Sequence, residues 1–133
     1  MGVASHHSEF VAHAVQNIPG AFLVGAYDAD ESRAKRFCEK FQTPRFDDLD
    51  SLLQDPNLKI GAVTSENSRK KEYAVAVARA GKHVLCDKPL GVTARESREI
   101  IDSCEKTGVT LQVGYISRVH CGSTNSEEDR RSR

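Results

Sequence analysis

The residues with the clearest chemical potential are Cys86-Asp87-Lys88-Pro89, which follow a short apolar run. Open parallel α/β sheets bind ligands beyond the carboxyl ends of their strands. A lysine at that edge can polarise a substrate hydroxyl or carbonyl group, or take part in proton transfer. Pro89 has a fixed φ and can hold the lysine in an unusual turn. A lone lysine in a loop is more often a solvent-exposed charge, so Lys88 needs support from other residues.

Asp28 is the second candidate, because it directly follows the apolar run at residues 21–27. An acidic residue at the end of the second strand of a dinucleotide fold accepts hydrogen bonds from the adenosine ribose. The next residue is Ala29, so no arginine stands there to bind a 2′-phosphate, and NAD is favoured over NADP. Taken alone, Asp28 is better interpreted as a turn or capping aspartate.

The opening segment, residues 2–7, is the third candidate. Dinucleotide folds place a glycine turn between the first strand and the first helix, where backbone N–H groups receive the pyrophosphate. Gly2 can be the first glycine of G-x-G-x-x-G, with Ala4 and His7 replacing the other two. An unstructured N-terminus that happens to contain a glycine is an equally good interpretation of this segment by itself.

Apolar periodicity predicts the elements that position these candidates. We expect strands at 21–27, 60–64, 83–86 and 111–115, a very short strand at 45–46, and helices at 8–17, 30–41, 48–54, 68–80 and 93–106. Asp30 and Thr93 are expected N-caps, and Gly81 and Gly108 are expected left-handed C-caps. Strands that alternate with helices imply right-handed parallel βαβ units. The predicted fold class is therefore α/β, a Rossmann-type parallel sheet with helices on both faces.

Two of these elements carry specific expectations about burial. The run at 21–27 is nearly continuously apolar, as expected of a strand that is covered on both faces. In the helix at 8–17, four apolar residues are spaced to form one buried face: Phe10, Val11, Ala14 and Val15.

The bulk properties exclude several classes of function. The formal net charge is zero, which gives no electrostatic reason to expect nucleic acid or an anionic membrane as a partner. No apolar run is long enough to cross a bilayer, and the N-terminus lacks the order of a signal peptide. The four cysteines are far apart without a C-x-x-C pair, so we expect no metal site and a reducing, cytoplasmic setting.

Together these segments resemble the Gfo/Idh/MocA family of NAD(P)-dependent oxidoreductases. Residues 80–90 (AGKHVLCDKPL) are similar to the family's AGKHVLCEKPL block, with Asp87 in place of glutamate. Residues 28–34 (DADESRA) resemble the end of its second strand and the helix that follows. Residues 111–115 (LQVGY), with Arg118, look like its sixth strand and exit. The resemblance extends from about Gly2 to His120.

The resemblance implies a role for each matching residue. Four residues would line the pyrophosphate turn: Gly2, Ala4, Ser5 and His6. Asp28 would bind the adenosine ribose. The loop after the next strand would pass along the cofactor with Ser65, Glu66 and Asn67. The acidic-lysine-proline motif is matched by Asp87 and Lys88, with Lys88 as the catalytic residue between nicotinamide and substrate. Arg118 would lie where the chain leaves the last strand toward the active site.

Some residues depart from the family pattern. Glu66 stands where proline is common and would add negative charge near the cofactor, so its side chain is expected to point away. Lys70 stands where histidine is common. Ala4 should be tolerated because a backbone amide still serves, whereas the bulk of His7 works against close helix–strand packing. His83 is interpreted as an ordinary strand residue, and two cysteines are expected to be small core residues, namely Cys86 and Cys104.

Two absences shape the expected domain organisation. We predict an incomplete dinucleotide-binding Rossmann domain at 1–120 and a disordered polar tail at 121–133. The family's first strand is central in the order 3-2-1-4-5-6, yet only Met1 precedes Gly2. The strands at 21–27 and 60–64 would then pair directly or leave a gap with unpaired backbone groups. The family's substrate domain has no counterpart after His120, so the chain is predicted to be a truncated oxidoreductase.

The leading functional hypothesis is hydride transfer between NAD (or NADP) and a sugar- or polyol-like hydroxyl group. The chain would be a cofactor-binding fragment with little or no turnover alone, and homo-oligomers would form only in a full-length protein. A non-catalytic dinucleotide-binding or interaction module is the alternative from another class. A product that never folds stably is the third possibility, motivated by the missing central strand.

Overall fold

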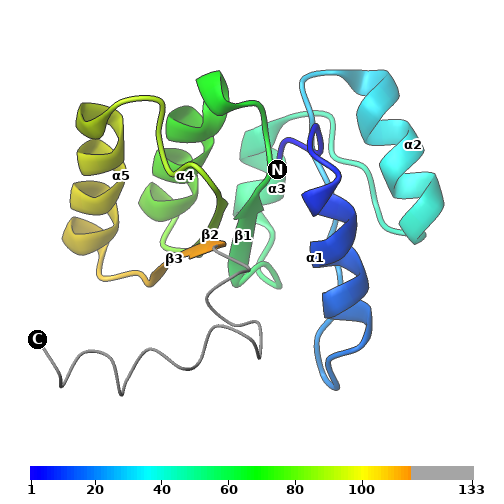
Figure 1. The fold of residues 1–133 in the computed structure, drawn as a ribbon. Helices are drawn as coiled ribbons and strands as arrows, with labels where there is room; N and C mark the ends of the chain where they lie inside the picture. The colour runs from blue at the N-terminus through cyan, green and yellow to red at the C-terminus, as the bar shows by residue number, and fades with distance from the viewer. Residues whose placement is uncertain (115–133) are drawn as a thin grey trace, which may run out of the picture.

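The structure is a computed structural model that describes residues 1–114 of the 133 in the chain. Three strands form one sheet: β1 (Ile60–Val63), β2 (His83–Asp87) and β3 (Leu111–Gly114). The helices are α1 (His7–Gln16), α2 (Glu31–Phe41), α3 (Leu49–Gln54), η1 (Asn67–Arg69), α4 (Lys70–Arg79) and α5 (Ala94–Thr107). Figure 1 shows α4 and α5 on one side of the strands and α1 and α2 on the other.

The sheet is parallel throughout, with the strand order β1-β2-β3. Its register places Val63 opposite Cys86, and Cys86 opposite Val113. Parallel strands have their carboxyl ends at the same edge of the sheet, so the residues after β1 and β2 lie along that edge. This arrangement confirms the predicted α/β class, a Rossmann-type parallel sheet with helices on both faces.

The predicted helix caps are confirmed. Asp30 accepts a hydrogen bond from the amide of Arg33 (3.0 Å), and Thr93 accepts one from the amide of Glu96 (3.1 Å). The Glu96 carboxylate accepts in return from the amide of Val92, which directly precedes the cap (2.9 Å). The two C-capping glycines have the expected left-handed φ angles, 70° at Gly81 and 69° at Gly108.

The hydrophobic core lies between the sheet and the α4–α5 pair. Its fully buried members include Val63, Val77, Val84 and Ile100. Cys86 and Cys104 belong to the same core, as the sequence predicted. Burial raises the pKa of Cys86 to about 11, so its thiol stays protonated near neutral pH and is a poor nucleophile.

The strand predicted at 21–27 is not formed, which corrects the sequence analysis. Within this segment only Ala26 makes a bridge, to Arg45, and the Phe22 side chain is 66% exposed rather than covered. A strand needs a continuous ladder of backbone hydrogen bonds with at least one neighbour, and the single bridge of Ala26 does not supply one. On the side facing β1, the segment meets a neighbouring backbone only at Met1 and Gly2.

Met1 and Gly2 occupy the position between the 21–27 segment and β1. The Gly2 amide donates to the carbonyl of Tyr27 (2.8 Å), the Met1 amino group donates to Ala62 (2.6 Å), and the Met1 carbonyl accepts from Thr64 (3.1 Å). Beyond this short contact, the two flanking segments do not pair with each other. A cavity of about 510 Å³ separates them. The sequence allowed either direct pairing of the segments at 21–27 and 60–64 or a gap between them. The structure has the gap.

The expected buried face of α1 also needs correction. Ser8 and Ala12 are its buried residues, whereas Phe10 is 59% exposed. Val11 and Val15 are half-buried and line the cavity beside β1. The periodicity correctly marked an apolar face, but little backbone lies opposite that face to cover it.

Some predictions lie outside the described residues, namely those for Tyr115, Arg118 and the tail at 121–133. Among residues 1–114, no helix combines the length and the apolar character that a membrane span requires.

Candidate dinucleotide-binding site

Residues 2–7 form a turn that is fixed against the loop after β1. The Thr64 hydroxyl donates to the Gly2 carbonyl (2.7 Å), and the Ser5 amide donates to the Thr64 carbonyl (3.2 Å). Gly2 has a φ of 63°, and a Cβ added there would overlap the Cβ of Ser65. Only glycine meets both conditions, so the first glycine of the predicted turn has a definite structural reason.

The turn leads into α1 and leaves two backbone donors available. The amides of Ala4 and His6 have no acceptor within residues 1–114, whereas the Ser5 amide is already bonded. The Ser5 hydroxyl accepts from the His7 amide (3.2 Å). Unpaired amides at the start of a ten-residue helix are suited to an anion such as a pyrophosphate.

Asp28 is buried at the end of the 21–27 segment and is only 6% exposed. Its Oδ2 accepts from the Val3 amide (2.7 Å), and its Oδ1 accepts from the Asp30 amide (2.8 Å). Burial alone would raise the pKa of Asp28. The hydrogen bonds from Arg33, Asp30 and Val3 outweigh burial, so this pKa lies below its ordinary value. Asp28 is therefore an ionised acceptor beside the turn.

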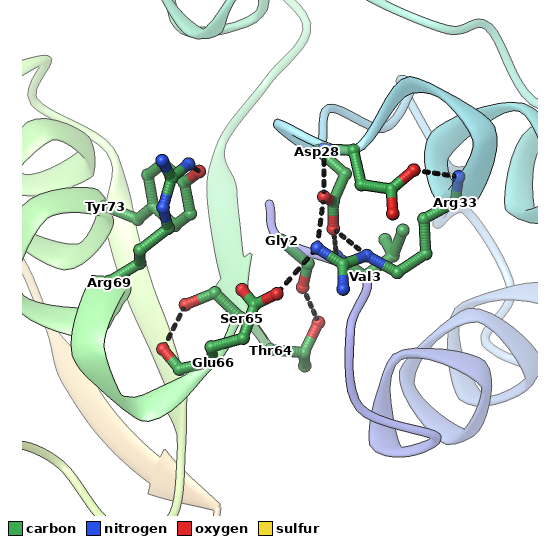
Figure 2. A network of polar contacts seen from close by, with 10 residues as sticks. Gly2, Val3, Asp28, Arg33, Thr64, Ser65, Glu66, Arg69 and Tyr73 are labelled. Atoms are coloured by element: carbon green, nitrogen blue, oxygen red, sulfur yellow. Dashed lines mark hydrogen bonds and ion pairs between the residues drawn. The ribbon is translucent and has the colours of Figure 1, made fainter.

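Arg33 is a site residue that the sequence analysis did not identify. Its Nη2 lies 2.8 Å from Asp28 Oδ1 and its Nε lies 3.2 Å from Asp28 Oδ2. The same Nη2 is 2.6 Å from Glu66 Oε1, so the guanidinium joins two carboxylates, as Figure 2 shows. No arginine follows Asp28 directly, but Arg33 lies in the first turn of α2 and reaches back to Asp28. The spacing Asp28-x-Asp30-x-x-Arg33 across an N-cap was the available signal.

Glu66 does not point away from the site, which corrects the expectation. Its carboxylate extends from the loop after β1 toward Arg33, on the side where Asp28 lies. The expectation rested on the negative charge that Glu66 would add near the cofactor. The Arg33 guanidinium between Glu66 and Asp28 offsets part of that charge. The neighbouring Ser65 is buried against Gly2, whereas Asn67 is exposed at the start of η1.

The second half of the site lies at the end of β2. Asp87 Oδ2 is 2.8 Å from His7 Nδ1, and Asp87 Oδ1 accepts from the Lys88 amide (2.8 Å). Lys88 itself is exposed. From its bulk alone, His7 is expected to work against close helix–strand packing. Its imidazole instead links the start of α1 to the end of β2.

Lys70 supports the turn that carries Lys88. It is 1% exposed, and its ammonium donates to the carbonyls of Lys88 (2.7 Å) and Pro89 (3.1 Å). Burial lowers the pKa of Lys70, an effect that the nearby Asp87 opposes. From the sequence, Lys70 is only a departure from the histidine that is common at this position. A lone buried lysine cannot be distinguished from a surface lysine without the fold.

The predicted residues therefore gather around one turn. Val3 contacts Asp28 near its beginning, and His7 contacts Asp87 near its end. Asp28 and Lys88 thus lie at the same edge of the sheet. At the end of η1, Arg69 donates to the Tyr73 hydroxyl of α4 (2.9 Å; Figure 2). Within residues 1–114, no group of three or more metal-binding side chains occurs.

A parallel sheet with a glycine turn at its carboxyl edge is typical of Rossmann-type α/β domains. The model of the Gfo/Idh/MocA oxidoreductase family, described as an NAD-binding Rossmann fold, matches residues 1–115. The chain belongs to this oxidoreductase family.

Known relatives agree with this assignment. The chain is 34% identical over 97 residues to trans-1,2-dihydrobenzene-1,2-diol dehydrogenase from Mus musculus, covering 72% of this chain and 29% of the relative. It is 26% identical over 125 residues to inositol 2-dehydrogenase from Salmonella typhimurium, covering 92% and 37%. The solved UDP-N-acetylglucosamine 3-dehydrogenase from Acidithiobacillus ferrooxidans has a TM-score of 0.83 and 25% identity, covering 98% and 40%. The chain spans roughly a third of the length of these proteins.

Proposed function

We propose that this chain is a cofactor-binding unit for NAD, with the pyrophosphate at the start of α1 and the adenosine ribose at Asp28. The observation that carries the proposal is the turn at 2–7, which offers the free amides of Ala4 and His6 between Asp28 and Asp87. Ser5, Ser65 and the loop residue Asn67 would line the same path. An available backbone anion site beside an ionised aspartate suits the pyrophosphate and the ribose of a dinucleotide.

We further propose that Lys88 is the catalytic residue of a hydride transfer to or from a sugar- or polyol-like hydroxyl group. Its ammonium is exposed at the carboxyl edge, and Asp87 fixes the lysine backbone. A bound nicotinamide supplies the hydride chemistry. Lys88 would polarise the reacting oxygen or relay its proton. The family membership and the diol and inositol dehydrogenases among its relatives support this substrate class.

The chain alone is expected to have little or no turnover. Lys88 is open to water, and nothing within residues 1–114 covers it, whereas hydride transfer needs a site that excludes solvent. The same observation favours the second candidate function, a non-catalytic dinucleotide-binding or interaction module. A cytoplasmic setting and homo-oligomers of a full-length form belong to the enzyme proposal. The first is supported by three free, buried cysteines among the described residues.

Calorimetric titration of the purified chain with NAD tests the binding proposal. We expect saturable binding that Asp28→Asn weakens at least about tenfold, because a neutral amide is a poorer acceptor for the ribose hydroxyls. Asp50→Asn, an equal charge change at an exposed position of α3, is the matched control and should bind like the wild type. Absence of binding at millimolar NAD by a folded chain would contradict the proposal.

A dehydrogenase assay then separates the two candidate functions. Binding without turnover supports a module or an incomplete enzyme. Steady-state oxidation of a sugar or polyol above the rate of Lys88→Ala would instead show that the described unit is catalytic by itself.

A further inference from the structure

We propose that Arg33 and Glu66 form a latch over Asp28 that selects a dinucleotide without a 2′-phosphate. This inference rests on the proposed function and deepens it, because it concerns the ribose end of the same site. The latch is defined by the contacts of the Arg33 guanidinium, which reach Asp28 on one side and Glu66 on the other. The two carboxylates come from different segments, one after residues 21–27 and one after β1.

Asp28 has no free acceptor position in the structure. An ionised carboxylate offers about four lone-pair positions. The protein uses four: the amides of Val3 and Asp30, and the Nε and Nη2 of Arg33. A ribose diol needs one or two of these positions. The two amides are held by the backbone, so Arg33 is the partner that must move.

Arg33 has a second partner to which it can turn. Its side chain is 29% exposed, and Glu66 (43% exposed) already holds the same Nη2 at 2.6 Å. The guanidinium can therefore leave Asp28 and remain paired with Glu66. In that position it still lies beside the ribose but its charge is neutralised. Glu66 thus keeps the arginine from acting as a free cation when the nucleotide is bound.

The charge balance of these three side chains disfavours a further negative group. Asp28 and Glu66 contribute two negative charges against the one positive charge of Arg33, so the cluster carries a net charge of about −1. A 2′-phosphate would bring up to two further negative charges to the same place. Like charges at contact distance in a partly buried site repel strongly. The ribose hydroxyl of NAD brings none, so the latch discriminates between the two cofactors.

Replacement of Glu66 by its neutral isostere tests this inference. In Glu66→Gln, Arg33 is released to bind a 2′-phosphate, and the ratio of NADP to NAD affinity should rise at least about tenfold. The double variant Glu66→Gln/Arg33→Met should lose this gain, because the gain depends on the freed guanidinium. Glu105→Gln, at an exposed position of α5, makes the same charge change far from the site and should leave the ratio unchanged.

Titrations of NAD and NADP into the four proteins, monitored by calorimetry, give the required ratios. An unchanged ratio in Glu66→Gln would overturn the latch, and so would a gain that persists without Arg33 or that Glu105→Gln reproduces. Each of these outcomes leaves NAD binding by the wild type intact. If the folded wild type binds neither cofactor, the proposed function fails and the latch fails with it, so the two failures are distinguishable.

Discussion

At the scale of single residues, Gly2 shows how the absence of a Cβ atom allows the turn at 2–7 to form. Two separate demands act on it: a left-handed φ of 63° and an approach to Ser65 that leaves no room for a Cβ. The first demand is common to many turn glycines. The second exists only because the turn at 2–7 lies directly against the loop after β1.

Gly2→Ala is therefore expected to destabilise the chain more than an ordinary glycine replacement. Gly20→Ala is the matched control, because Gly20 has a φ of 81° and open space around it. The control should lose about 1 kcal/mol of unfolding free energy from the left-handed conformation alone. Gly2→Ala should lose roughly 2 kcal/mol more from the clash and should weaken NAD binding. Equal losses in urea unfolding would contradict the close approach.

Replacement of the buried Lys70 is also expected to lower the free energy of unfolding. Lys70→Met removes the donor of two carbonyls, those of Lys88 and Pro89, and should cost about 2 kcal/mol of unfolding free energy. Lys106→Met, at an exposed position in the last turn of α5, should cost little.

The loss at Lys70 should also depend on pH. Because burial lowers the folded-state pKa of Lys70 below 10.5, the unfolded chain binds more protons in the range just below that value. Wild-type stability therefore rises with pH through this range, whereas Lys70→Met has no such contribution. The stability difference should widen toward pH 10.5, as measured by urea unfolding. A difference that stays constant, or that narrows, would contradict burial of the charged amine.

At the scale of elements, local signals were reliable wherever a helix or strand has its neighbours. The capping residues Asp30 and Thr93 and the glycines at 81 and 108 act as predicted, because caps depend on contacts within a few residues. The 21–27 segment is the opposite case. Its residues have the composition of a buried strand, but strand formation depends on partners that lie far away in sequence.

At the scale of the whole molecule, the cavity between the 21–27 segment and β1 is the dominant feature. It is about 510 Å³ in volume and is lined mostly by apolar side chains. β1 forms one flank of the cavity, and the 21–27 segment, which is not a strand, forms the other. Met1 and Gly2 already pair with both flanks at the carboxyl end of the cavity.

A five-residue apolar extension placed before Met1 is therefore expected to stabilise the fold. It would extend the short contact of Met1 into a parallel strand between Ala62 and the 21–27 segment. Burial of several aliphatic side chains should raise the midpoint of thermal unfolding by about 5 °C or more. An extension of five glycine and serine residues is the control. If both extensions have the same effect in calorimetry, the cavity is not a strand site.

The sequence by itself determined the fold class, most of the helices, the helix caps and the family block around Lys88. These features follow from periodicity, capping and short motifs, which are local in the chain. It also identified Asp28, which directly follows the apolar run at 21–27, and the turn at 2–7, where Gly2 matches the first glycine of G-x-G-x-x-G.

Only the tertiary structure decided which side chains meet. It brought Arg33 between Asp28 and Glu66, placed Lys70 beneath the lysine turn, and paired His7 with Asp87. It also decided that the 21–27 segment forms no continuous ladder of strand hydrogen bonds. The physical reason is the same in each case: long-range ion pairs and strand pairing depend on distances across the fold, and spacing along the chain does not encode them.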